Sequence, residues 1–406
     1  MFTYTLPRNR FANYDNYGPE WWYQGSIDIY DGKIGMISMH YDGDIDDIIG
    51  AIVYEDDVWL SYGIPDDQTM PIYGQPNCAR LSSNGSLFFY TCCITWGESG
   101  NIHHNRLYRF QRGEAPLYYD VFDSHWIDLT PYKTRQDDNY NYMDCAGNRV
   151  ACMVLLIGKD GGSVYYWAVK VSDNNGVSFH TEYALPNAGT VKYDDHAQLR
   201  MSEDGIVWIA YVRYEDDMIE LWKSNAGATD FTKIWEIDYS GALGGNANYM
   251  IFDVSDTDGE DVTISLGRYS GGTYYRSTYY SVNYGVAFNV NNYNSSTYTM
   301  GTRGSIDGEY VVITSQEIGE TNYGWHRSVN SGGAFSFVNP SIYGMSGSYI
   351  DQQKYDNEII FVECGESFVD GVDLQGLLYS DDYGATWEII TSPISIVTEP
   401  YQWVFK

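Results

Sequence analysis

The chain has 406 residues, of which 55 are Asp or Glu and 23 are Lys or Arg, and its formal net charge is −32. A surface with this much negative charge repels nucleic acid and anionic membranes. We therefore expect neither specific nucleic-acid binding nor membrane insertion. No apolar stretch is long enough to cross a bilayer. The 40 tyrosines exceed what a core can bury with every hydroxyl satisfied, which predicts that many lie on the surface or in an interface.

Residues 1–20 contain Pro7 and no repeat, and they are predicted to form an N-terminal arm or a closing strand. They hold no apolar run with a small-residue cleavage site, so we expect no secretory signal and synthesis in a cytoplasm. The six cysteines, at positions 78, 92, 93, 145, 152 and 364, lack zinc-site spacing. We interpret all six as buried free thiols, which fits a reducing compartment.

Residues 21–391 repeat a strand–turn–strand pattern about every 54 residues. Each unit has a hairpin signal followed by a run of β-branched and aromatic residues, and most signals favour primed turns, in which both central residues have φ > 0. The signals are Asp31-Gly32, Asn84-Gly85, Ala146-Gly147, Asp204-Gly205, Asp258-Gly259, Asp307-Gly308 and Asp356-Asn357. One such unit suits one blade, so the region is predicted to be all-β, a single seven-bladed β-propeller of four-stranded antiparallel blades.

Acidic clusters occur where the second and third strands of units one and four should join, at Asp42, Asp44, Asp46, Asp47, Glu215, Asp216 and Asp217. The loops between blades are predicted to carry rings at Tyr73, His125, Trp126, Tyr132, Tyr140, Tyr142, Tyr193, Tyr293, Tyr298 and Tyr343. Such a face could bind sugars or cations. The alternative, which we favour, is a solvated loop surface whose tyrosines pack against another subunit.

Two acidic stretches, 42–47 and 256–261, also resemble fragments of calcium loops. Neither completes the twelve-residue pattern, because no Glu stands at its last position. We therefore expect no cofactor and keep calcium as the alternative.

Three arginines, Arg80, Arg200 and Arg303, each stand four residues before the first hairpin turn of units two, four and six. This shared position predicts that they lie at one depth on the innermost strands and converge on the central channel. Asp28, Asp253 and Asp351 should lie on the same set of strands. We favour a structural ring of salt bridges over an anion-binding site.

A second motif, Ser-x-Asp-x-Gly-x-Thr-Trp, marks a later hairpin of the unit and is clearest near the C-terminal end. Its residues there are Ser380, Asp382, Gly384, Thr386 and Trp387. Weaker copies, in which Asn replaces Asp, stand at Ser328, Asn330, Gly332 and Phe335, at Ser281, Asn283, Gly285 and Phe288, and at Ser172, Asn174, Gly176 and Phe179. The Ser and Asp oxygens can accept turn amides, and the glycine can take φ > 0.

This motif resembles the Asp-box, or BNR repeat, of sialidase-like β-propellers. The resemblance implies that each box closes the hairpin of the third and fourth strands and that its aromatic fills the space between blades. Sialidases hold a substrate carboxylate with three arginines, so it also implies an anion site at Arg80, Arg200 and Arg303. The family's Phe-Arg-Ile-Pro motif is absent, however, and no Tyr–Glu nucleophile pair can be assigned.

Residues 392–406 lie beyond the last unit and are predicted to form a closing strand or a docking arm. No catalytic residue is assigned, since serine-nucleophile elbows, HExxH and P-loops do not occur. We expect a non-catalytic propeller that serves as a structural or receptor- or glycan-facing component of a larger assembly, a virus or phage particle, for example its tail. The alternative is a glycan-directed enzyme, sialidase-like or another glycoside hydrolase, because two carboxylates suffice for that chemistry.

Overall fold

The structure is a computed structural model. It describes residues 27–41, 46–55, 58–63, 79–97, 100–115, 117–126, 142–157, 165–185, 196–213, 217–244, 247, 249–255, 259–307, 310–317, 323–338, 350–355, 358–363, 368–369, 372–373 and 377–390. The two predicted terminal arms, residues 1–20 and 392–406, lie outside the described residues.

The described strands form four-stranded antiparallel sheets, each built from strands that follow one another in the chain. The first two sheets are β1 (Ile27–Tyr30), β2 (Lys33–Tyr41), β3 (Asp46–Glu55), β4 (Val58–Gly63), and β5 (Ala79–Leu81), β6 (Leu87–Gly97), β7 (Gly100–Phe110), β8 (Leu117–Trp126). The next two are β9 (Tyr142–Ala146), β10 (Arg149–Ile157), β11 (Tyr165–Ser172), β12 (Tyr183–Ala184), and β13 (His196–Met201), β14 (Val207–Arg213), β15 (Met218–Ser224), β16 (Phe231–Asp238).

After the one-turn helix α2 (Ser240–Leu243), three further four-stranded sheets follow. They are β17 (Tyr249–Val254), β18 (Val262–Ser270), β19 (Thr273–Ser281), β20 (Asn289–Ser295); then β21 (Tyr298–Asp307), β22 (Tyr310–Glu317), β23 (Tyr323–Ser328), β24 (Ser336–Val338); and β25 (Ile350–Tyr355), β26 (Glu358–Glu363), β29 (Leu377–Ser380), β30 (Glu388–Ile390). A small hairpin, β27 (Phe368–Val369) and β28 (Val372–Asp373), is inserted in the last sheet.

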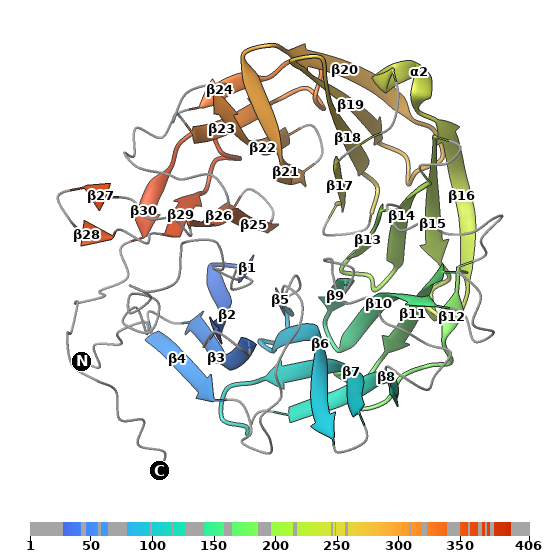
Figure 1. Ribbon diagram of the computed structural model, residues 1–406, viewed down its shortest axis with the longest axis vertical. Coiled ribbons are helices and arrows are strands. Elements are labelled where there is room, and N and C mark those ends of the chain that lie inside the picture. Colours follow the sequence, from blue (N-terminus) through green and yellow to red (C-terminus); the bar gives the residue numbers. More distant parts are fainter. Residues whose placement is uncertain are drawn as a thin grey trace.

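The sheets stand around a common axis, with the first strand of each sheet innermost (Figure 1). Each innermost strand contacts that of the next sheet, in the order β1, β5, β9, β13, β17, β21 and β25, and β25 contacts β1. The residues nearest the axis therefore come from stretches of sequence far apart from one another.

The described hairpin signals lie at the turns between the first and second strands, but most of these turns differ from the predicted type. Asp31 and Gly32 both have φ > 0, as a primed two-residue turn requires. At Asn84-Gly85 and Asp204-Gly205 only the glycine does. These loops are longer: the amide of Gly85 donates to the carbonyl of Ser82, and the Asn84 side chain accepts the amide of Ser86.

Four Ser-Asx-Gly turns, which begin at Ser172, Ser281, Ser328 and Ser380, share one pattern of hydrogen bonds. In each, the serine hydroxyl accepts the amide of the glycine four residues later, at 2.8–3.0 Å. The Asn or Asp between them accepts an amide from the far side of the turn. The residue before each glycine also has φ > 0. The turns thus satisfy their own backbone donors.

The aromatic that ends each of these turns packs on the preceding sheet. Trp387 stacks on Trp325 with ring centroids 4.4 Å apart, and Phe288 stacks on Trp235 at 4.1 Å. Phe335 meets Tyr293 edge-on at 5.0 Å. Phe179 packs against the apolar cluster that includes Leu107 of the second sheet. Each turn therefore links two neighbouring sheets as well as two strands.

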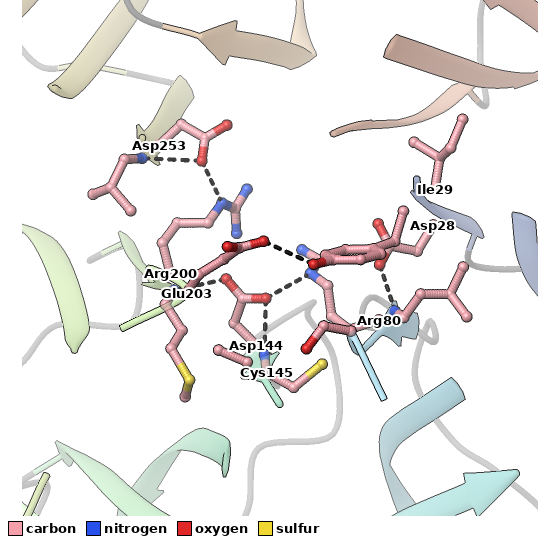
Figure 2. Close-up of a pocket in the computed structure, with 14 residues that line it drawn as sticks. Asp28, Ile29, Arg80, Asp144, Cys145, Arg200, Glu203 and Asp253 are labelled. Carbon is pink, nitrogen blue, oxygen red and sulfur yellow. Dashed lines mark hydrogen bonds and ion pairs between the residues drawn. The ribbon is translucent and has the colours of Figure 1, made fainter. Parts of the chain in front are cut away.

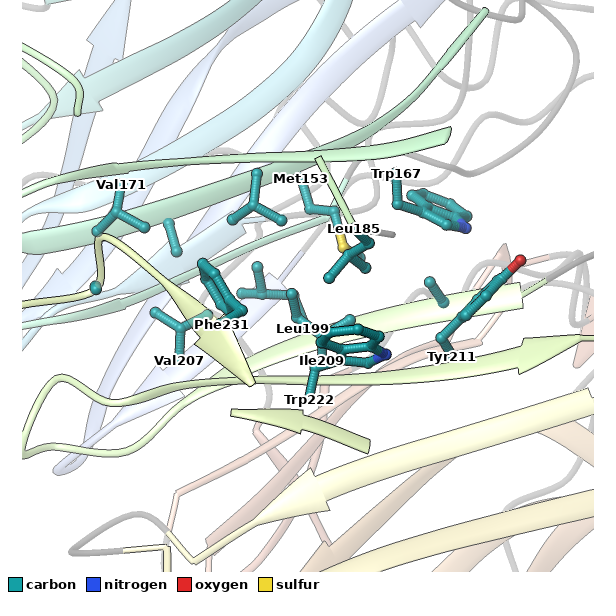
Figure 3. Close-up of a cluster of buried hydrophobic side chains, with 14 of the residues drawn as sticks. Met153, Trp167, Val171, Leu185, Leu199, Val207, Ile209, Tyr211, Trp222 and Phe231 are labelled. Atoms are coloured by element: carbon teal, nitrogen blue, oxygen red, sulfur yellow. The ribbon is translucent and has the colours of Figure 1, made fainter. Parts of the chain in front are cut away.

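Apolar clusters fill the spaces between neighbouring sheets, as the cluster between the third and fourth sheets illustrates (Figure 3). Trp167 and Val171 of β11 face Ile209 of β14 and Trp222 of β15 there. Successive side chains of a strand point to opposite faces, and burial is nearly continuous along β14 and β15, so the fourth sheet, to which both belong, has two apolar faces, one for each neighbour. A sheet of this kind is stable only between two others.

Several residues predicted to lie in loops are in strands. Asp46 and Asp47 lie in β3, paired with Tyr41 and His40 across the hairpin. His125 and Trp126 end β8, and the tyrosines at 142, 293 and 298 lie in β9, β20 and β21. The prediction of loops here was wrong because the strands extend further than the apolar runs by which they were recognised.

Candidate axial site

A polar cavity of about 70 Å³ lies where the innermost strands of the first five sheets approach the axis. Five of its six charged lining residues lie on the innermost strands, and these five alternate in sign from sheet to sheet (Figure 2). They are Asp28 of β1, Arg80 of β5, Asp144 of β9, Arg200 of β13 and Asp253 of β17. We call these five residues the axial belt.

Two ion pairs join neighbouring sheets within the axial belt. The Nε atom of Arg80 lies 3.5 Å from Oδ1 of Asp144, and the Nε atom of Arg200 lies 3.3 Å from Oδ1 of Asp253. All four side chains are at least four-fifths buried. Each arginine also donates from Nη1 to the carbonyl of the residue before it.

The carboxylates of the axial belt also accept backbone amides, some of them from the next sheet. Asp28 accepts the amide of Leu81 at 2.6 Å, and Asp144 accepts the amide of Met201 at 2.7 Å. Asp144 takes the amide of Cys145 on its other oxygen, and Asp253 takes that of Val254. The belt therefore fastens β1 to β5, β5 to β9, β9 to β13 and β13 to β17.

Burial dominates the protonation equilibria of the belt. Burial raises the pKa of Asp28 to about 7, although the Arg80 guanidinium and the Leu81 amide act in the opposite direction. Burial also raises the pKa of Asp144, against the attraction of Arg80 and Arg200. The pKa of the neighbouring Cys145 thiol is raised well above its ordinary value by burial and by Asp144. Two carboxyl groups with raised pKa values thus share one cavity.

One hydrogen bond spans the cavity from the first sheet to the fourth. The hydroxyl of Tyr30 donates to Oε1 of Glu203 at 2.7 Å, and both residues line the cavity. Figure 2 shows the Glu203 side chain reaching across the axial belt. This bond is exposed to solvent, unlike the buried pairs of the axial belt.

Two of the three arginines that were predicted to converge on the channel have described side chains. Arg80 and Arg200 lie on innermost strands and line the same cavity. Arg303 lies in β21 beside an irregular register, and Asp351 lies in β25, but the side chains of both fall outside the described residues. Since Arg80 and Arg200 are each paired with an aspartate, their charge is already balanced by the protein.

Most of the predicted acidic face lies outside the described residues. Asp42, Asp44, Glu215 and Asp216, and the side chains of Asp46 and Asp47, lie outside the described residues. Asp217 is described: it has φ 54, and its carbonyl accepts the amide of Tyr239 at the foot of α2. It is therefore a turn residue of the fourth sheet.

Of the two candidate calcium stretches, residues 42–45 and 256–258 lie outside the described residues. Among the described residues, no group of three or more His, Cys, Asp or Glu side chains is placed to hold a metal ion. The same part of the chain contains no helix long and apolar enough to cross a membrane. Of the six cysteines, Cys145 and Cys152 are described as free thiols.

Sequence reasoning missed three lining residues, Asp144, Tyr30 and Glu203. A signal for Asp144 exists, because it stands two residues before the end of its inner strand, as Asp28 does. For Tyr30 and Glu203 there is none, since their bond joins residues 173 positions apart.

No protein-family model matches the sequence, and no curated protein matches it. Among solved structures, the chain is similar to prolyl oligopeptidase B from Galerina marginata, with 10% identity, a TM-score of 0.51, and coverage of 90% of this chain and 50% of that one. It is also similar to acylaminoacyl peptidase from Pyrococcus horikoshii, with 9% identity, a TM-score of 0.50, and coverage of 91% of this chain and 52% of that one. The chain spans about half the length of these two peptidases.

A third similar structure is the β-propeller domain of the Trilobed protease from Pyrococcus furiosus, at 10% identity and a TM-score of 0.48, covering 93% of this chain and 99% of that one. Identities this low show fold alone. Four-stranded antiparallel sheets that stand around one axis, first strand innermost, are the defining arrangement of a propeller. The chain therefore has the β-propeller fold.

Proposed function

We propose that the chain is a closed, seven-bladed propeller of the Asp-box type that acts without catalysis, as a structural or receptor- or glycan-facing component of a larger assembly such as a virus or phage particle. The observation that carries this proposal is the axial belt. Its arginines are paired with aspartates, and its carboxylates accept amides of neighbouring strands. The charged groups that converge on the axis thus serve to hold sheets together.

The four Ser-Asx-Gly turns support the same proposal. Their polar atoms bond within the turn, and their aromatics pack on the preceding sheet. Contact between β25 and β1 favours a ring closed between the first and last sheets. The residues that distinguish this sequence are therefore engaged in building a rigid ring, as suits a subunit that presents surfaces to others.

Turnover assays test the absence of catalysis. The purified chain is incubated with fluorogenic glycosides, including a sialoside, and with peptide substrates, beside an Asp28→Asn/Asp144→Asn variant. We expect the two proteins to release the same background signal. Cleavage by the wild type that the double variant lacks would overturn the proposal, provided that circular dichroism shows both proteins folded.

One observation favours a second candidate, a glycan-directed hydrolase. Asp28 and Asp144 both have raised pKa values in one cavity, and perturbed carboxyl pairs occur at acid–base sites. Paired structural networks also perturb pKa values, and here desolvation is the largest cause for both groups. The assay above decides between the two candidates, since a hydrolase of this kind would lose its activity when the two carboxyl groups are replaced.

A further inference from the structure

Strand β20 is the outer edge of the fifth sheet, and neither it nor the turn that leads into it carries a charge. Residues 277–302 contain no Asp, Glu, Lys, Arg or His, in a chain whose net charge is −32. Edge strands present unpaired N–H and C=O groups to other chains, and soluble proteins usually guard them with lysine, proline or inward-pointing charges. None of these guards is present in β20.

The other outer strands are short or charged. β12, β24 and β30 have two or three residues each. β16 carries Lys233, Glu236 and Asp238, and β8 carries Asp120 and Asp123. β4 is uncharged but follows three consecutive acids, at positions 55–57. Among the described outer strands, β20 is therefore the one that is both longer than three residues and uncharged together with the residues on either side of it.

The side chains of this region are apolar or self-complementary. We name residues 281–295 the neutral edge. Val286 is 76% exposed, Val282 61% and Val290 45%. Asn289 and Asn294 are exposed amides, each able to donate and to accept a hydrogen bond. Exposed apolar side chains beside an unguarded strand mark a surface suited to a protein partner.

The neutral edge is continuous with the sixth sheet. Asn291 of β20 donates from Nδ2 to the carbonyls of Asn330 and Ser331, in the Ser-Asx-Gly turn of that sheet. Residues 328–350 also contain no charged residue, and Val329 is 48% exposed. The uncharged surface thus extends over two adjacent sheets.

We propose that the neutral edge docks a second copy of this chain, with β20 pairing antiparallel to β20 of that copy across a twofold axis. This inference rests on the proposed assembly role and names the surface and the partner. A basic partner would be drawn to the acidic remainder of the protein, whereas a copy is repelled by it and can approach where carboxylates are absent. Asparagine amides complement their own kind, as an interface between identical surfaces requires.

Sedimentation velocity of the full chain, over a concentration series at low and high NaCl, tests the proposal. We expect a monomer–dimer equilibrium that salt strengthens, because screening weakens repulsion between the acidic copies. Val290→Glu places two carboxylates in each dimer, and we expect it to weaken association at least about tenfold. Val286→Glu, in the preceding turn, should do the same and serves if Val290→Glu fails to fold.

The matched control is Val177→Glu. Val177 is 57% exposed in the equivalent turn of the third sheet, so this variant adds the same charge to the same kind of turn away from β20. It should leave the dimer unchanged. A chain that stays monomeric in high salt, or a dimer that tolerates both Val290→Glu and Val286→Glu, would overturn the neutral edge as a docking surface. Neither result would bear on whether the chain is an enzyme, which the turnover assay tests separately.

Discussion

At the scale of single residues, Asp382 shows how a turn can be stabilised by its own side chain. Its carboxylate accepts the amides of Ala385 and Thr386 and the hydroxyl of Thr386, at 2.7–2.9 Å. Burial alone would raise its pKa, but these bonds and that of Ser380 outweigh burial and lower it. Asn283 and Asn330 hold the same place in other sheets and accept the equivalent amide without a charge.

Replacing Asp382 therefore has a built-in control. We expect Asp382→Ala to lower the free energy of unfolding by about 1–3 kcal/mol, because it leaves turn amides without an acceptor. Asp382→Asn should retain most of that stability, since it recreates the turns of the fifth and sixth sheets. Chemical denaturation of the three proteins measures both effects. Equal stability of wild type and Asp382→Ala would show that the turn bonds contribute nothing.

Asp28 should couple stability to pH. Its pKa in the folded chain is about 7, above the ordinary value near 4, so the folded state holds a proton that the unfolded state releases. The resulting stabilisation is fully present below pH 4 and is lost as pH rises through 7. We expect the free energy of unfolding of Asp28→Asn, measured relative to that of wild type, to be higher at pH 8 than at pH 4. Urea denaturation at pH 4, 6 and 8 measures this; parallel pH profiles would contradict the raised pKa.

At the scale of structural elements, the glycines of the Ser-Asx-Gly turns carry two constraints. Gly332 has φ 79, and a Cβ atom there would overlap Oγ1 of Thr278 in the preceding sheet. Gly384 likewise approaches Val312. The turn can therefore reach its neighbouring sheet only with glycine at this position, and the aromatic beside it completes the contact.

A pair of alanine substitutions separates these two constraints. Gly113 has φ 80 but open space where its Cβ would stand, so Gly113→Ala should cost only backbone strain, about 1 kcal/mol. Gly332→Ala adds a clash with Thr278, and we expect a further loss of about 1–3 kcal/mol. Thermal unfolding of both variants gives the difference. An equal loss of stability in the two variants would mean that the neighbouring sheet can move away from a methyl group at this contact without a loss of stability.

At the scale of the whole molecule, negative charge opposes compaction. The excess of 55 acidic over 23 basic residues repels itself across the surface, whereas the ion pairs of the axial belt are buried and respond weakly to salt. We therefore expect Tm to rise when NaCl is increased from about 0.02 to about 0.5 M. Differential scanning calorimetry of Val290→Glu, which should not dimerise, measures this without a contribution from association. A fall in Tm would show that surface ion pairs outweigh the net repulsion.

Features that depend on a few neighbouring residues were predictable from the sequence. The position of the first hairpin, the strand order within sheets and the left-handed glycines 176, 285, 332 and 384 follow from turn chemistry and alternation over less than one repeat. The position of the arginines relative to those hairpins also placed Arg80 and Arg200 on inner strands. Such inferences hold because the bonds involved close within five residues or across one hairpin.

Other features were decided only when the sheets packed. Asp144 bonds the amide of Met201, which is 57 residues away, and Tyr30 bonds Glu203 from the first sheet to the fourth. Whether an arginine near the axis meets a ligand or an aspartate depends on the neighbouring inner strand, which no local pattern specifies. The exposure of β20 likewise follows from its place as the last strand of its sheet. Side chains far apart in sequence meet only because the ring brings their strands together, so their pairing and burial belong to the tertiary structure.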